Sequence, residues 1–223
     1  MKPFEPLGQA ISPEGALIKL VRRGEEYFIL ADGAVLMTSR THGSEEALAT
    51  LACQRARTLE NPTVLIGGLG MGFTLRATLD LLPPGAAIVV AELVSAVVDW
   101  NLGPLAALAG GPLNDARVRV EIADVAATIK ANPGQFDAVL LDVDNGPAAF
   151  TAPNNATLYS ADGIAAIHEA LKPLGVLSIW ATNDDRDFER RLRTARFQVA
   201  VHHPRARLKS GGSRHTIFLA RKF

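Results

Sequence analysis

The sequence predicts a doubly wound α/β fold, and two patterns carry this prediction. From Pro62 onward, continuous apolar stretches of about five residues alternate with segments of helical periodicity. Continuous apolar strands are typical of a parallel sheet that helices cover on both faces. Near the C-terminal end, two alternating apolar stretches flank a glycine-containing loop, which predicts an antiparallel hairpin that completes the sheet.

The expected elements follow from where each apolar stretch begins and ends. We expect parallel strands at residues 63–68, 87–92, 117–124, 136–143 and 176–182. We expect helices near residues 72–82, 94–102, 125–131, 160–171 and 184–194. The hairpin strands are expected at residues 197–205 and 214–222, around a loop that holds residues 209–212.

A different pattern precedes this α/β region. Short stretches with alternating apolar positions predict a small β meander at residues 16–24, 25–33 and 34–40. Ser44 then opens an apolar-periodic segment through Thr58, which we expect to be a helix. Because 223 residues are too few for two ordinary domains, we divide the chain into a β meander at residues 1–42 and one α/β domain at residues 43–223.

The composition is that of a packed globular protein, with 48% hydrophobic and 21% charged residues. The one cysteine, Cys53, cannot form an internal disulfide, and no Cys/His cluster has zinc spacing. His202 and His203 alternate across a strand, so they cannot both face one metal. No apolar run reaches the roughly 18 residues that a bilayer span needs. We therefore expect no metal, no membrane span and a cytoplasmic location.

The charge is distributed unevenly although the net charge is zero. Residues 186–223 hold eleven Lys and Arg against two Asp and Glu, which leaves the preceding residues at minus nine. Two interpretations remain open for this basic region. It is either a solvated surface that balances an acidic neighbour, or a surface that binds anions or nucleic acid.

Four glycines, Gly67, Gly68, Gly70 and Gly72, lie where the first predicted parallel strand turns into a helix. They allow the backbone to pass close to a ligand that side chains would otherwise block. A phosphate-binding P-loop would place a lysine after the last glycine, and the dinucleotide fingerprint would place a glycine there, but Phe73 occupies that position. The loop therefore predicts a nucleoside-type ligand in preference to ATP or NAD.

Two acids follow the next predicted strands. Glu92 ends the second strand, where a carboxylate can accept hydrogen bonds from both hydroxyls of a ribose. Asp124 ends the third strand, and two roles are open for it. Its carboxylate could accept from the amino group of an adenine, or it could cap the helix that follows.

A second acidic pair, Asp142 and Asp144, lies at the carboxyl end of the fourth strand, beside the expected switch point of the sheet. Residues two apart on an extended strand point the same way. The pair could hold a cationic amine, act as a general base toward a nucleophilic amine, or cap the turn at residues 145–147.

Loops at this edge of the predicted sheet hold further candidates. Trp180 lies near the end of the fifth strand and could rim an acceptor pocket or fill the core. Tyr159 belongs to the long loop after residue 147, which could be a lid or a plain surface loop.

Several of these motifs together resemble the spermidine synthase family. VLIGGLGMGFTLR resembles its glycine loop, and AELVSAVVDWN resembles its strand with the ribose-binding acid. DARVRVEIADVAATI resembles its segment ending in the adenine-contacting acid. FDAVLLDVDNGPAAF, followed by LYSADG, resembles its aspartate-rich loop. The resemblance covers roughly residues 61–180.

The resemblance implies a Rossmann-like class I methyltransferase fold, with a mostly parallel seven-stranded sheet, a terminal antiparallel hairpin and an N-terminal β extension. It implies decarboxylated S-adenosylmethionine as the donor and transfer of its aminopropyl group to putrescine. The glycines would line the methionine side of the donor, Glu92 would hold the ribose and Asp124 the adenine. Asp142 would take the proton from the attacking amine, with Asp144 as the second catalytic acid. The residues that we place in the substrate pocket are Asn145, Tyr159, Trp180 and Glu45.

Three features of the sequence depart from the family pattern. The family's glycine loop contains an Asp that contacts the amine of the donor, whereas this chain has Leu69 and Met71. Only one residue separates Asp142 from Asp144, whereas two separate the family's aspartates. The family's Tyr-His-Glu stretch is represented by residues 42–46, His-Gly-Ser-Glu-Glu.

Three hypotheses for the function follow. The first is a transferase that uses S-adenosylmethionine or its decarboxylated form to alkylate an amine-bearing small molecule. The sequence supports aminopropyl and methyl transfer equally. The second is a nucleic-acid methyltransferase in which the basic stretch from Arg190 to Lys209 grips phosphates. The third is a non-catalytic nucleoside-binding or dimerisation protein. We expect a homodimer.

Overall fold

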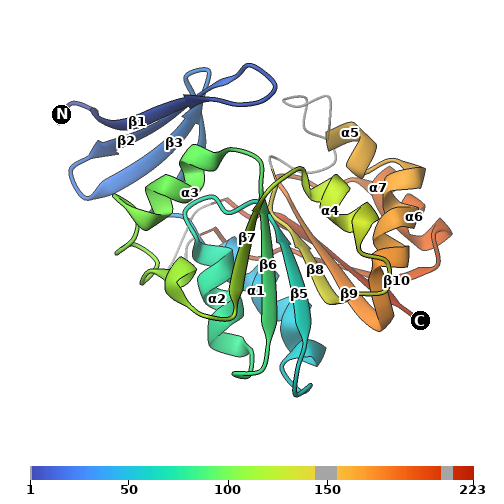
Figure 1. Cartoon of the computed structure of the whole chain (residues 1–223). Helices are drawn as coiled ribbons and strands as arrows, with labels where there is room; N and C mark the ends of the chain where they lie inside the picture. Colours follow the sequence, from blue (N-terminus) through green and yellow to red (C-terminus); the bar gives the residue numbers. More distant parts are fainter. Residues whose placement is uncertain (1, 144–154, 207–212) are drawn as a thin grey trace.

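The computed structural model describes residues 2–143, 155–206 and 213–223. Within this part of the chain, the strands form a main sheet of seven strands and an N-terminal sheet of four strands. The N-terminal sheet lies over one end of the main sheet (Figure 1). The α/β fold class, the mostly parallel sheet and the terminal antiparallel hairpin predicted from the sequence are confirmed.

The main sheet has the order β10-β11-β9-β8-β5-β6-β7. Its first five strands along the chain pair in parallel, and β10 and β11 form the antiparallel hairpin that joins β9. The strands are β5 (Thr63–Gly67), β6 (Ala87–Glu92), β7 (Val118–Ile122), β8 (Phe136–Leu141), β9 (Leu171–Ala181), β10 (Phe197–His202) and β11 (Thr216–Lys222). Each parallel strand lies where the sequence predicts it, although β9 begins earlier, at Leu171.

Helices cover both faces of the main sheet (Figure 1). The helices of one face are α1 (Gly43–Ala56), α2 (Phe73–Leu81) and α3 (Ser95–Leu102). The other face carries α4 (Val125–Ala131), α5 (Asn155–Leu158), α6 (Ala161–Ala170) and α7 (Arg186–Thr194). A short 3-10 helix, η1 (Pro112–Asn114), precedes β7.

The two apolar cores follow from the alternation of side chains along each strand. On β5, Val64 and Ile66 pack with α1 and α2, whereas Leu65 packs with the opposite helices. On β8, Ala138 and Leu140 face the α1 side. Continuing this alternation, Asp142 just beyond β8 also faces the layer of α1 and α2.

The N-terminal sheet has the antiparallel order β1-β2-β3-β4, with β1 (Glu5–Ile11), β2 (Leu17–Arg23), β3 (Glu26–Ala31) and β4 (Ala34–Thr38). Strands β2, β3 and β4 match the predicted meander, whereas β1 was not expected from the sequence. Buried side chains of this sheet, including Leu20 and Ile29, belong to the same apolar cluster as those of α1 and α2. The sheet is therefore packed onto the main core.

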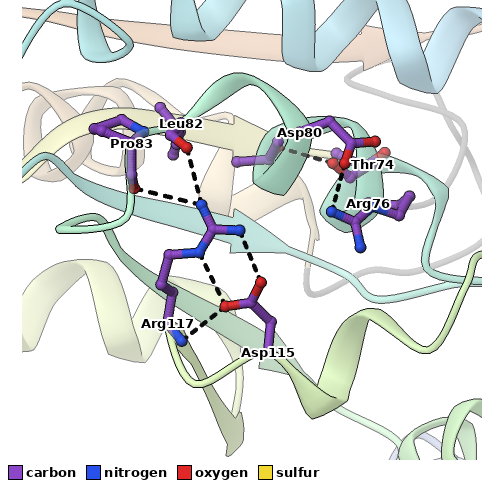
Figure 2. A network of polar contacts seen from close by, with 8 residues as sticks. Thr74, Arg76, Asp80, Leu82, Pro83, Asp115 and Arg117 are labelled. Atoms are coloured by element: carbon purple, nitrogen blue, oxygen red, sulfur yellow. Dashed lines mark hydrogen bonds and ion pairs between the residues drawn. The ribbon is translucent and has the colours of Figure 1, made fainter.

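At the amino ends of β6 and β7, Arg117 joins two turns (Figure 2). Its Nε and Nη2 atoms donate to the two carboxylate oxygens of Asp115, at 2.9 and 2.7 Å. Its Nη1 donates to the carbonyl of Leu82 at 2.9 Å and lies 3.4 Å from that of Pro83. Hydrogen bonds from Arg117 hold the pKa of Asp115 at about 2, well below its usual range. The guanidinium thereby connects the turn after α2 to the turn before β7.

We expect Arg117→Ala to lower the free energy of unfolding by about 2 kcal/mol, because it leaves a carboxylate and a carbonyl without their donor. Urea denaturation of the variant measures this loss. The matched control is Arg119→Ala on β7, because Arg119 is exposed and pairs with Glu121 at 2.8 Å. An exposed ion pair contributes about 0–1 kcal/mol. Equal losses in the two variants would contradict the bridging role of Arg117.

Candidate active site

The carboxyl ends of four neighbouring strands, β8, β5, β6 and β7, bring the predicted site residues to one edge of the sheet. After β5 the chain runs outward to β6 and β7, and it then returns to the other side of β5 to form β8. The switch point therefore lies between β5 and β8. Open α/β sheets bind ligands at this position. Gly67 and Asp142 meet there, since the Asp142 N–H donates to the Gly67 carbonyl at 2.9 Å.

The glycine loop, residues 67–72, passes close to its neighbours. Gly68 has a φ of 84°, which favours glycine, and a Cβ at this position would lie 2.6 Å from the Asp142 carbonyl oxygen. A Cβ on Gly70 would lie 3.1 Å from the Met37 side chain of β4. The loop is thus packed between the end of β8 and the N-terminal sheet. A side chain at Gly68 would overlap backbone, whereas one at Gly70 would require the Met37 side chain to shift.

Glu92 holds the glycine loop to the end of β6. Its Oε2 accepts from the Leu69 N–H at 2.8 Å, and its Oε1 accepts from the Val94 N–H at 2.9 Å. Asn101 of α3, a buried residue that sequence reasoning missed, donates from Nδ2 to the Gly70 carbonyl at 2.8 Å. The carboxylate and the amide together fix the shape of the loop. The predicted contact of Glu92 with a ribose remains a prediction.

Asp124 occupies the N-cap position of α4. Its Oδ1 accepts from the Ala126 N–H at 2.8 Å, and the residue is exposed. Of the two roles left open by the sequence, the structure shows the helix cap. A contact with an adenine stays a prediction. It is compatible with the cap, because a carboxylate that caps a helix through one oxygen retains further acceptor positions.

Asp142 is half-buried and faces the start of α2. Its Oδ2 accepts from the Thr74 hydroxyl at 2.7 Å. Burial raises the pKa of Asp142 to about 6, while the hydrogen bond from Thr74 opposes this shift. A carboxylate with a pKa near neutrality is suited to accept a proton at physiological pH. Asp144 and Asn145 lie outside the described residues.

Glu45, in the first turn of α1, is 6% exposed. The Ser44 hydroxyl lies 2.6 Å from its Oε2. Burial and the negative charge of Asp142 both raise the pKa of Glu45, to about 8, and the Ser44 hydrogen bond opposes them. The structure therefore brings Glu45 and Asp142 into one electrostatic unit, although they come from different elements. Asp142 and Glu45 do not both carry a full charge near neutral pH.

This raised pKa predicts a pH-dependent effect of Glu45→Gln. Folded Glu45 holds a proton that the unfolded chain loses above its ordinary pKa, so wild-type stability falls as pH rises between about 4.5 and about 8. Glutamine does not ionise, so its burial causes no loss of stability at high pH, and it still presents an oxygen to Ser44. We expect the variant to be more stable than the wild type above pH 8, by on the order of 1 kcal/mol or more, and to lose this advantage near pH 4.

Thermal melts of both proteins across this pH range measure the effect, and the expected difference in Tm at alkaline pH is roughly 2–4 °C or more. Glu60→Gln, at an exposed position after α1, is the control and should leave the difference near zero at every pH. A pH-independent difference for Glu45→Gln would contradict the prediction.

A polar and aromatic group lies next to Glu45; sequence reasoning named Trp180 as a site residue but missed Ser44 and His215. The Ser44 hydroxyl is 2.9 Å from His215 Nδ1, although 171 residues separate them. Trp180 is half-buried, and its ring meets that of His215 edge-on at 4.7 Å between centroids. His42 stacks on Phe73 at 4.1 Å, which joins the start of α1 to the end of the glycine loop.

The fold that carries these residues is similar to those of several solved structures. The crystal structure of spermidine synthase from Thermotoga maritima has 21% sequence identity to this chain, and the match covers 98% of this chain and 73% of that one, with a TM-score of 0.78. The chain has a spermidine synthase-like fold. A spermidine synthase in complex with the transition state analogue AdoDATO matches at 20% identity, with coverage of 98% and 72% and a TM-score of 0.75.

A third similar structure is a probable spermidine synthase from Corynebacterium glutamicum. It has 15% identity and a TM-score of 0.65, and the match covers 98% of this chain and 81% of that one. Protein-family models and curated protein sequences gave no match. At this level of identity, the spermidine synthase-like fold confirms the resemblance that the motifs indicated, and the reaction remains to be argued from the site.

On this spermidine synthase-like fold, the predicted residue Tyr159 lies apart from Glu45. Tyr159 is buried on the α4–α7 face, where its ring packs edge-on against Phe188 at 5.6 Å. His203 lies on the surface beyond β10 and bonds to Asp184 at 2.8 Å. A role of Tyr159 in substrate binding stays a prediction.

In α7, Arg190 pairs with Asp187 and Arg193 with Glu189, at 2.9 and 2.7 Å, so much of this basic helix is neutralised locally. Among the described residues, no group of three or more His, Cys, Asp or Glu is arranged to hold a metal ion. None of the helices in the described ranges is long and apolar enough to cross a membrane.

Proposed function

We propose that this protein transfers the aminopropyl group of decarboxylated S-adenosylmethionine to the nitrogen of a small-molecule amine. The observation that carries the proposal is the position of Asp142. Its backbone bonds to Gly67 at the switch point, beside the glycine loop, and burial raises its pKa to about 6. A proton acceptor thus lies directly beside the proposed donor cradle.

The residues of the cradle fit such a donor. The glycines at positions 67, 68, 70 and 72 carry no side chains, so the loop backbone would lie along the ligand. Glu92, at the end of the next strand, would accept hydrogen bonds from ribose hydroxyls while it continues to hold the loop, because each carboxylate oxygen accepts more than one hydrogen bond. Asp124 would lie at the adenine end. The similar structure that holds a transition state analogue supports this donor class.

The chemistry needs little beyond positioning. The amine nitrogen forms a bond to the carbon attached to the sulfonium, the carbon–sulfur bond breaks, and its electron pair stays on sulfur. The nitrogen then loses one proton, and Asp142 would accept it. Holding the two reactants in line supplies much of the rate enhancement, and the base supplies the rest.

Methyl transfer from intact S-adenosylmethionine is the second candidate, and one observation favours it. Leu69 and Met71 are buried and apolar where the family's loop carries an Asp for the amine of the donor. The loop thus lacks the carboxylate that would recognise the aminopropyl cation. Both candidates use Asp142 and the glycine loop in the same way.

Isothermal titration calorimetry with three ligands separates the candidates: S-adenosylmethionine, its decarboxylated form and 5′-methylthioadenosine. We expect the decarboxylated donor to bind more tightly than the intact donor, and a product assay with putrescine to detect aminopropyl transfer. Tighter binding of the intact donor would select methyl transfer. Binding of none of the three would overturn the proposal and favour a non-catalytic protein.

A further inference from the structure

A row of hydrogen-bonding groups leads from Glu45 to the surface. Ser44 is fully buried, and its Oγ lies 2.6 Å from Glu45 Oε2 and 2.9 Å from His215 Nδ1. On the far side of the imidazole, His215 Nε2 lies 3.2 Å from the hydroxyl of Ser213, which is exposed. The row is therefore continuous, in hydrogen-bond distances, from a buried carboxyl group to solvent.

The Ser44 hydroxyl can conduct a proton in this row because it has one hydrogen and two lone pairs. When Glu45 is ionised, Ser44 donates to it and accepts from the Nδ1–H of His215. When Glu45 is protonated, the carboxyl group donates to Ser44, and Ser44 donates to Nδ1. The same geometry serves both protonation states, and a switch between them moves one proton along the row.

Asp142 controls the inner end of this row electrostatically. The charged groups that act on Glu45 are Asp142, just beyond β8, and Glu46 from α1 itself. While Asp142 is negative, it helps to keep the proton on Glu45. If Asp142 takes up a proton, that repulsion disappears, and Glu45 becomes a stronger acid. Burial lowers the pKa of His215, so the imidazole passes a proton on rather than retaining it.

Alkylation of an amine, the function proposed above, delivers one proton to Asp142 in each turnover. We infer that Glu45, Ser44 and His215 form a proton outlet: when Asp142 gains a proton, Glu45 releases its own proton through Ser44 and His215 to Ser213 and solvent. The Glu45 O–H bond breaks, the Ser44 oxygen gains that proton, and its original proton passes to Nδ1. The Nε2 proton then leaves to Ser213 or water, so no charge accumulates on the ring. The proton on Asp142 then passes to the ionised Glu45, which restores the base, and exchange of ring protons with solvent returns His215 to its Nε2–H tautomer. Glu45, Ser44 and His215 thus act on the reaction through Asp142 and are positioning residues.

The first test needs no substrate, so it stands even if the proposed reaction is wrong. The ¹⁵N shifts of the His215 ring are followed by NMR against pH in the wild type, Ser44→Ala and Glu45→Gln. We expect the Nδ1 resonance of the wild type to show a second transition as Glu45 titrates. Both variants should lose that transition and keep the intrinsic His215 titration. Identical curves in the three proteins would overturn the outlet.

The second test uses turnover once a donor and an acceptor are established. We expect His215→Asn to lower kcat about tenfold in dilute buffer, with donor affinity unchanged and with most of the loss restored by added imidazole. His203→Asn is the matched control, because this exposed histidine of the same hairpin pairs with Asp184 and lies outside the row. A loss in His215→Asn that imidazole does not restore would overturn the outlet, since it would indicate a merely structural role.

Discussion

Asp142→Asn will lower kcat by about 10²–10⁴-fold, the usual contribution of a positioned general base. Asparagine has nearly the same shape and can still accept the Thr74 hydrogen bond, which is 2.7 Å long in the wild type, but it cannot accept a proton from the amine. Donor affinity should change little, because the Asp142 contact with the glycine loop runs through its backbone N–H to Gly67. Turnover assays and calorimetric titration of the donor measure the two effects separately.

Thr74→Val is the matched control for Asp142. It keeps the carboxylate but removes the hydrogen bond that lowers the pKa of Asp142, so that pKa should rise above its value of about 6. The base works only when ionised, and the acidic limb of the kcat profile should therefore move to higher pH, with kcat at alkaline pH preserved. Asp142→Asn with near wild-type turnover would remove Asp142 from the chemistry.

The second large effect is expected for Gly68→Ala. Gly68 has a φ of 84°, and the added Cβ would lie 2.6 Å from the Asp142 carbonyl oxygen, which is backbone and cannot rotate away. We expect a loss of about 2 kcal/mol in the free energy of unfolding from strain and overlap together. Donor affinity should fall at least about tenfold, because a shift that relieves the overlap displaces the cradle.

Gly33→Ala separates the two causes of that loss. Gly33 has the same φ of 84°, but an added Cβ there has no neighbour within 4 Å. Its replacement should cost only the backbone strain, on the order of 1 kcal/mol, and should leave donor affinity unchanged. Urea denaturation and calorimetry of both variants test this comparison. Equal losses of stability would mean that the close approach to Asp142 adds nothing at Gly68.

The main sheet was predictable because its parallel strands are buried on both faces, which forces continuous apolar stretches such as those of β5 and β8. Strand β1 was not predicted, for the opposite reason. It is partly exposed, pairs on one side only and contains Pro6 and Gly8, which weaken any strand pattern. A Cβ on Gly8 would clash with the indole of Trp100. The need for glycine at position 8 therefore comes from a tertiary contact, which the local sequence does not reveal.

The positions of candidate site residues were predictable where each residue follows from its own strand. Gly67 and Glu92 end buried strands and Asp142 directly follows one, and the sheet order alone brings such ends together. By contrast, the Ser44–His215 contact joins positions 171 residues apart, and nothing in either neighbourhood identifies the partner. Asp124 was ambiguous because an acid after a strand and an acid before a helix occupy the same position in the sequence; the structure shows the cap.

The edge-on packing of Trp180 against His215, 4.7 Å between ring centroids, couples an intrinsic fluorophore to a titratable ring. An imidazolium accepts an electron from an excited indole more readily than a neutral imidazole does, so emission from Trp180 should dim each time His215 becomes charged. The chain has two tryptophans, and the other, Trp100, is buried in the α1 face of the core, in contact range of β1. With Trp100 replaced by phenylalanine, the protein would report the charge of one histidine by light alone, without an attached dye.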